Sequence, residues 1–182
     1  VHQMVAAQLI TWTKPRSMLS SGSLGTMGVS LGYAIGAKLA DDTKTVISID
    51  GDGSFNMTNT ELKTIMDLQI PVKILLLNNN SEMMVEYWQK LFFDGRYVST
   101  NNENCDYNKL AEAYNIHNLY CDNEKDLDIK MNEFLDYKGP VLFHVKIQKT
   151  PCLPLVSPGK SIDNMILVDD MYTEIDKSEV PS

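Results

Sequence analysis

The feature that most constrains the fold is a pair of short apolar runs, each of which ends in a cluster of polar residues. The first run, 44–50, is rich in β-branched residues and leads into Asp-Gly-Asp-Gly-Ser at 50–54. The second run, 72–78, leads into three asparagines at 78–80. Near-continuous apolar runs bounded by turn residues predict buried parallel strands. The segment between them is long enough for one crossover helix, so both polar turns are expected at the same, carboxyl edge of a sheet.

Helical and strand patterns alternate through the rest of the chain. Helices are predicted over 2–10, 26–40, 58–69, 82–93, 107–115 and 123–137, and further strands over 117–121 and 141–147. The helix at 58–69 is predicted to start at Thr58, because Thr58 and Glu61 have the spacing of a capping box. This order predicts an α/β fold in which helices cover both faces of a parallel sheet.

Composition excludes several classes of protein. The chain has 182 residues, of which 43% are apolar and 22% charged, which suits a globular domain and excludes collagen-like, coiled-coil and wholly disordered chains. Sixteen basic and 24 acidic residues give a net charge of −8, most of it beyond residue 101, which argues against nucleic acid as the main partner. No apolar run is long enough to span a membrane, and no signal peptide is visible.

Cysteine usage and the chain ends bear on location and domain organisation. The three cysteines are widely spaced, so we expect neither a disulfide framework nor a metal cluster, and a reducing, intracellular compartment is favoured. The sequence opens on Val1 directly before a helical pattern, which predicts a piece of a longer protein. We expect one domain over 1–150 and an irregular acidic arm over 151–182, which holds four of the seven prolines.

The two polar turns predict a site for a hard cation beside a diphosphate. Asp52 would supply a carboxylate, Asn79 an amide oxygen, and a residue just beyond a backbone carbonyl. Mg²⁺ prefers such oxygen ligands and usually takes one or two carboxylates together with waters and phosphate oxygens. Gly51 and Gly53 would let backbone N–H groups approach the anion. Each turn alone is an ordinary loop, and only their spacing indicates a shared site.

The segment GDGSFNMTNTELKTIMDLQIPVKILLLNNN resembles the thiamine-diphosphate motif, in which GDG is followed one crossover later by NN. HQMVAAQ and KPRSMLSSGSLGTMG upstream, and MVEYWQ, KLAEAY, KGPVLFHV and CLPLV downstream, are similar to the catalytic subunit of acetolactate synthase (acetohydroxyacid synthase). The resemblance extends from His2 to about Val156 and matches the C-terminal, diphosphate-binding domain of that family. It implies the thiamine-diphosphate-binding fold.

For the metal and the diphosphate, the resemblance implies particular positions in this sequence. The cation would be held by a carboxylate, an amide and a backbone carbonyl, from Asp52, Asn79 and Ser81 respectively. The residues beside the phosphates would be His2, Gly51, Gly53 and Ser54. Without the resemblance, His2 would be interpreted as a surface histidine.

Other implied positions concern the rest of the cofactor and the substrate. Met27, within a segment that holds the aminopyrimidine ring, would bend the cofactor, and the Gly25 carbonyl would accept a hydrogen bond from the 4′-amino group. Met84 would contact the cofactor, whereas Val85 and Trp88 would shape the pocket for the second substrate. From helical spacing alone, Met27 and the apolar face of the fourth predicted helix would be core residues.

The implied reaction decarboxylates pyruvate and joins the remaining two-carbon unit to a second 2-keto acid, in branched-chain amino-acid biosynthesis. Thiamine diphosphate and Mg²⁺ are the implied cofactors, with FAD bound mostly by a middle domain that this chain lacks. The glutamate that activates the cofactor belongs to an N-terminal pyrimidine-binding domain, which is also missing. The isolated chain is therefore predicted to be inactive, and the full-length protein is expected to be a homo-oligomer.

Two alternatives remain open. Another thiamine-diphosphate-dependent 2-keto-acid decarboxylase or carboligase would share the metal motif, although Trp88 and the CLPLV segment favour acetolactate synthase. A catalytically inert module of the same fold is favoured by Met83, because the family usually has Gly at this position in the loop over the diphosphate. A long side chain there is expected to crowd the cofactor.

Overall fold

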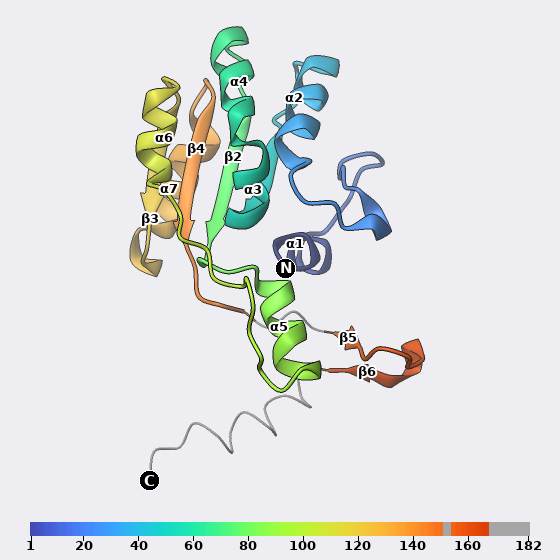
Figure 1. Ribbon diagram of the computed structural model, residues 1–182. Helices are drawn as coiled ribbons and strands as arrows, with labels where there is room; N and C mark the ends of the chain where they lie inside the picture. The colour runs from blue at the N-terminus through green and yellow to red at the C-terminus, as the bar shows by residue number, and fades with distance from the viewer. Residues whose placement is uncertain (151–153, 168–182) are drawn as a thin grey trace.

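The structure is a computed structural model that describes residues 1–150 and 154–167, and residues 151–153 and 168–182 lie outside the described part. Its strands are β1 (Ile47–Gly51), β2 (Lys73–Asn78), β3 (His117–Cys121), β4 (Val141–Lys146), β5 (Leu155–Val156) and β6 (Met165–Ile166). Its α-helices are α1 (His2–Leu9), α2 (Ser30–Ala40), α3 (Asp52–Thr58), α4 (Leu62–Leu68), α5 (Met83–Phe92), α6 (Tyr107–Ala113) and α7 (Leu127–Asp136). Figure 1 shows their arrangement. None of these helices is long and apolar enough to cross a membrane.

The central sheet has the order β1-β2-β4-β3, and each neighbouring pair of strands is parallel. In its register, Gly51 lies beside Leu77, and Asn78 lies beside Lys146. The polar turns that follow β1 and β2 are therefore at the same carboxyl edge of the sheet, which is where open α/β folds bind ligands. The predicted α/β class with a parallel sheet is confirmed.

The core lies on both faces of this sheet, because alternate strand residues point to opposite sides. On one face, Ile74 and Leu76 pack with buried residues of α2, α3, α4 and α6, which are Leu31, Ile35, Phe55, Leu62, Ile65 and Tyr107. On the other face, Leu75 and Phe143 pack with Phe134 of α7. Each fully buried Leu, Ile or Phe contributes about 1.5–3 kcal/mol by removal from water. Helices on both faces thus hold the strand ends in place.

The glycine-rich helix begins later than predicted. Helix α2 starts at Ser30 rather than at residue 26. Gly25 and Gly28 have φ angles of 55° and 77°, in the left-handed region, so a right-handed helix cannot continue through them. Leu39, near the end of this helix, is exposed. Gly25 and Gly28 therefore lie in a turn before α2, whereas Gly32 and Gly36 lie within the helix.

The predicted capping box is wrong. Helix α3 already begins at Asp52 and ends at Thr58, and α4 begins at Leu62 without a side-chain cap. The Thr58 hydroxyl donates to the Gly28 carbonyl oxygen at 2.9 Å, so it is engaged elsewhere. As a result, the helix that follows β1 starts at the polar turn itself.

The segment after β4 contains more structure than the predicted irregular arm. Strands β5 and β6 form an antiparallel pair, and a single 3₁₀ turn over 162–164 precedes β6. The rest of the predicted arm, 168–182, lies outside the described residues. Cys105 is an exposed free thiol and Cys121 a buried one, whereas Cys152 is also outside the described part. Elsewhere, element ends differ from the prediction by a few residues, as at β1, which starts at Ile47 rather than at residue 44.

Candidate metal and diphosphate site

Asp52 is the first residue of α3, and its side chain is buried at the carboxyl edge of the sheet with 2% exposure. Its Oδ2 accepts hydrogen bonds from Asn104 Nδ2 at 2.7 Å and from Asn102 Nδ2 at 3.2 Å. Both amides come from the loop between α5 and α6, in which the sequence predicts no site residue. Burying a carboxylate is costly unless donors or a cation partner it. The two amides provide such donors and fix the position of Oδ2.

The end of β2 is held by a buried network around Asn78. Its Nδ2 lies 3.0 Å from His144 Nε2, and His144 Nδ1 lies 3.0 Å from Asn108 Oδ1. Because an amide oxygen only accepts, His144 carries its proton on Nδ1 and accepts from Asn78 through Nε2. Burial lowers the pKa of His144, which favours this neutral form. The Asn78 oxygen consequently points to the loop, where it accepts from the Asn80 backbone N–H at 3.0 Å.

The remaining predicted metal ligands lie in this loop. Asn79 Oδ1 accepts a hydrogen bond from the backbone N–H of Ser81 at 3.1 Å, which shapes the turn. Ser81 is buried and pairs with Asn101 in an isolated antiparallel bridge. Its hydroxyl donates to Glu86 of α5 at 2.5 Å. The loop is thus ordered from both sides before α5 begins.

Asn104 joins the two strand ends. Its Nδ2 lies 2.7 Å from Asp52 Oδ2, 3.2 Å from Asn78 Oδ1 and 3.4 Å from Asn80 Oδ1. The polar turns therefore face each other, and the oxygen atoms gathered there are the kind that Mg²⁺ takes. Among the described residues, no three His, Cys, Asp or Glu side chains cluster as metal ligands. A set of one carboxylate, one amide and one carbonyl does not require such a cluster.

Two glycines at this edge are approached closely by side chains. A Cβ atom on Gly53 would lie 1.9 Å from Glu82 Oε1, and one on Gly51 would lie 2.8 Å from His2 Nδ1. Only glycine allows these contacts without displacing the neighbour. The Glu82 carboxylate thus lies directly against the Gly53 backbone, where the resemblance places the diphosphate, so a diphosphate fits there only after this side chain moves aside. The oxygen donors of Asp52, Asn79 and Ser81 suit a hard cation.

His2 is not a surface histidine. It packs on Gly51, and its Nε2 lies 3.7 Å from Asp50 Oδ1. Burial, and to a smaller extent the charge of the terminal amino group, lower the pKa of His2 to about 4. Burial also raises the pKa of Asp50 to about 6, against the opposing effect of hydrogen bonds from Ser54 and Gly51. A neutral imidazole therefore faces Asp50 at neutral pH, and this contact is not an ion pair.

The glycine turn before α2 is attached to α3. The Gly28 N–H donates to Ser54 Oγ at 2.9 Å, and the Thr58 hydroxyl donates to the Gly28 carbonyl. These two bonds bring Met27 next to the start of α3. Met27 is 39% exposed, so it is not the core methionine that helical spacing alone would suggest. Gly25 also lies in this turn, where its left-handed φ ends a single 3₁₀ turn.

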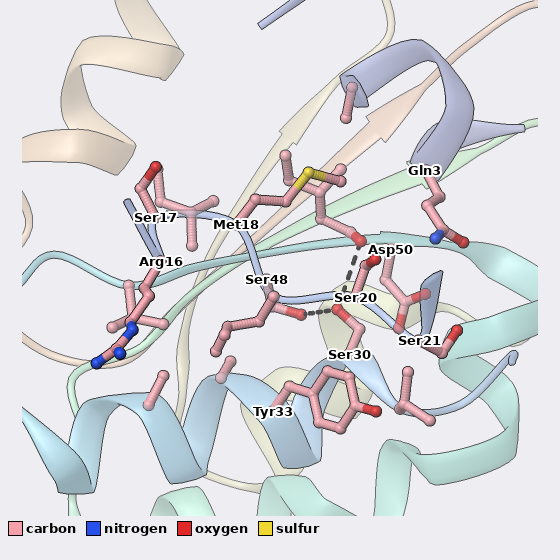
Figure 2. Close-up of a pocket in the computed structure, with 18 of the residues that line it drawn as sticks. Gln3, Arg16, Ser17, Met18, Ser20, Ser21, Ser30, Tyr33, Ser48 and Asp50 are labelled. Carbon is pink, nitrogen blue, oxygen red and sulfur yellow. Dashed lines mark hydrogen bonds between the residues drawn. The ribbon is translucent and has the colours of Figure 1, made fainter. Parts of the chain in front are cut away.

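A cavity of about 560 Å³, lined by both polar and apolar residues, extends from the site, between α1, the loop that follows it, α2 and the edge of β1. Figure 2 shows its wall of serines, in which the Oγ atoms of Ser30 and Ser48 are 2.5 Å apart. Asp50 also lines it, and its buried Oδ2 has no well-formed hydrogen bond to any described residue. His2 and Ser54 line the same cavity. Two of the four residues predicted beside the phosphates, His2 and Ser54, thus line this cavity, whereas Gly51 and Gly53 are not among its lining residues.

A second cavity, of about 580 Å³, lies along α5. It is lined by apolar, aromatic and polar side chains, namely Met84, Val85, Trp88, Gln89, Phe93 and Arg96. The buried face of α5 is formed instead by Met83 and Tyr87. The residues that the resemblance placed in the substrate pocket therefore share one cavity, and they are not the buried core face that spacing alone predicts.

Met83 belongs to a separate apolar cluster. It packs with Tyr87 and with Leu155 of the β5–β6 hairpin, and Val1 and Ile166 border this cluster. A long side chain at this position therefore has a place within the packing of the protein. The expected crowding of the cofactor by Met83 stays a prediction.

Comparison with known proteins identifies the class. Residues 1–145 match the family of the thiamine pyrophosphate enzyme, C-terminal TPP binding domain, and the chain belongs to this family. It is 48% identical over 169 residues to the acetolactate synthase catalytic subunit, mitochondrial, of Saccharomyces cerevisiae, and 48% identical over 171 residues to the acetolactate synthase, mitochondrial, of Schizosaccharomyces pombe. It is 42% identical over 167 residues to the acetolactate synthase isozyme 2 large subunit of Escherichia coli.

These alignments cover 92%, 93% and 91% of this chain but 25%, 26% and 30% of the three relatives. The chain thus spans about a quarter of the length of the relatives it matches. The resemblance to acetolactate synthases that the motifs predicted is confirmed.

Proposed function

We propose that this chain is the domain of an acetolactate synthase that binds thiamine diphosphate and Mg²⁺. The observation that carries the proposal is the cluster at the sheet edge, where Asn104 joins Asp52 to the turn after β2. Family membership and the names of the relatives support it. Asp52, Asn79 and the Ser81 carbonyl would hold the metal, because they bring hard oxygen atoms to one edge.

The other predicted residues would bind and orient the cofactor. His2, Gly51, Gly53 and Ser54 would contact the phosphates, and Met84 would also contact the cofactor. Met27 and Gly25 would orient the aminopyrimidine end, which the hydrogen bonds of the glycine turn to α3 support. When bound, thiamine diphosphate supplies the carbon nucleophile and the electron sink for decarboxylating a 2-keto acid. This chain's share of the work is binding, orientation and exclusion of water.

The proposed substrates are 2-keto acids, with pyruvate as the first. The second 2-keto acid would enter the cavity along α5, whose apolar wall of Val85 and Trp88 suits a small aliphatic side chain. Edge-to-face stacking of Trp88 on Phe92, with ring centroids 4.7 Å apart, would keep this wall in place. We also propose that FAD is bound, mostly by another domain, and that the full-length protein is an intracellular homo-oligomer.

A product assay tests this function. The full-length protein that contains this chain should form acetolactate from pyruvate with thiamine diphosphate and Mg²⁺, whereas the 182-residue chain alone should not. The physical reason is that the activating glutamate would come from a pyrimidine-binding domain. Turnover by the chain alone would contradict this division of labour, and a full-length product other than an acetohydroxy acid would favour another decarboxylase or carboligase.

A further inference from the structure

Glu82 lies directly before α5, and its carboxylate covers the backbone at the start of α3. An added Cβ on Gly53 would lie 1.9 Å from Glu82 Oε1 and 2.6 Å from Oε2, so both oxygens face this glycine. The proposed function places the diphosphate against the same backbone. Two anionic groups cannot share this space, because they would overlap and repel each other.

The position of Glu82 is fixed by neighbouring groups. Its backbone N–H donates to the Thr100 carbonyl oxygen at 2.8 Å, and its Oε1 accepts from Asn102 Nδ2 at 3.1 Å. The same Asn102 nitrogen lies 3.2 Å from Asp52 Oδ2. One amide group therefore holds two carboxylates at this edge. A cation bound by Asp52 would offset the negative charge of the Asp52 carboxylate. The negative charge of the Glu82 carboxylate would still repel an incoming anion.

We propose that Glu82 determines how tightly this site binds a diphosphate, because its carboxylate competes with the anion for the space over Gly53. This inference rests on the proposed function. For a diphosphate to bind, the Glu82 side chain must rotate away from Gly53 and give up its hydrogen bond to Asn102. A neutral side chain of the same size would move at lower cost and would not repel the phosphates.

The test measures binding of inorganic pyrophosphate with Mg²⁺ by calorimetry. Glu82→Gln removes the charge and keeps the size and an acceptor for Asn102, so it should bind about tenfold more tightly than the wild type. Glu103→Gln is the matched control, because Glu103 is exposed in the same loop and its replacement changes the net charge equally. It should bind as the wild type does.

The outcomes separate the inference from the proposed function. Equal or weaker binding by Glu82→Gln, or an equal gain in Glu103→Gln, would overturn the role of Glu82. Asp52→Asn tests the site itself and should abolish the Mg²⁺-dependent binding. If Asp52→Asn binds as the wild type does, the proposed metal site is wrong, whatever Glu82 does. Absence of binding in both the wild type and Glu82→Gln would contradict both claims.

Discussion

Replacing Asp50 by Asn should stabilise the folded chain at neutral pH and leave its stability nearly unchanged in acid. Asp50 ends β1 with 0% exposure, and its Oδ1 accepts from the Gly51 N–H at 3.1 Å. Its Oδ2 is buried without a well-formed hydrogen bond. Burying a charge in this way opposes folding. Asn keeps the shape of the side chain and removes the charge.

The magnitude follows from the pKa of Asp50. Burial raises it from 3.8 to about 6, and two units of pKa correspond to about 3 kcal/mol. Between these pH values the folded chain binds the proton more tightly than the unfolded chain, so this carboxyl makes the wild type less stable as pH rises. Asp50→Asn has no carboxyl group at this position, so its stability does not fall in this way as pH rises. The unfolding free energy of Asp50→Asn should therefore exceed that of the wild type by an amount that grows by up to about 3 kcal/mol between about pH 4 and pH 7.

Urea unfolding followed by circular dichroism, at steps across this pH range, measures the difference between variant and wild type. The lowered pKa of His2 has the opposite sign, since its contribution to stability grows as pH rises from about 4 towards 6.5. Because His2 Nε2 lies 3.7 Å from Asp50 Oδ1, the same comparison is repeated with His2→Gln in both proteins, so that only Asp50 titrates differently. Asp42→Asn, which removes an exposed carboxylate, is the control and should change stability by less than about 0.5 kcal/mol throughout. A difference for Asp50→Asn that does not vary with pH would refute the reasoning.

Two further variants test packing and positioning. Met83→Gly removes the contacts with Tyr87 and Leu155 and should lower the unfolding free energy by about 3 kcal/mol, measured by urea unfolding; a loss below about 1 kcal/mol would contradict the packing role. Asn104→Ala removes the 2.7 Å hydrogen bond to Asp52 and should weaken Mg²⁺ binding by about tenfold in a calorimetric titration. The exposed Asn132→Ala is its control, and equal affinities in the two variants would argue against positioning by Asn104.

The sheet and the two facing turns could be predicted because their signals are local. Apolar runs and turn residues define strands, and the crossover rule brings the strand ends to one edge. Asn104 and His144 could not be found this way, since they reach Asp52 and Asn78 from 52 and 66 positions further along the chain. No periodicity encodes such a contact, and a run of asparagines in a loop has no distinctive pattern.

Two errors in the predicted helices have their physical cause in the glycine turn. The helix before β1 was predicted to start too early, because helical spacing ignores the left-handed φ angles of Gly25 and Gly28. The predicted capping box does not form, because the Thr58 hydroxyl donates to the Gly28 carbonyl oxygen, 30 positions away. In both cases tertiary contacts of the glycine turn override the local pattern. This same turn carries residues proposed to orient the cofactor.

The central claim is that Asp52 anchors a metal-dependent cofactor site in this chain. Calorimetry with thiamine diphosphate, in the presence and absence of Mg²⁺, tests it most directly when the wild type is compared with Asp52→Asn, and circular dichroism verifies that both are folded. The wild type should bind only with Mg²⁺, and Asp52→Asn should lose this binding, because the metal would lack its one carboxylate ligand. Equal binding by the two proteins, or wild-type binding that does not depend on Mg²⁺, would contradict the claim.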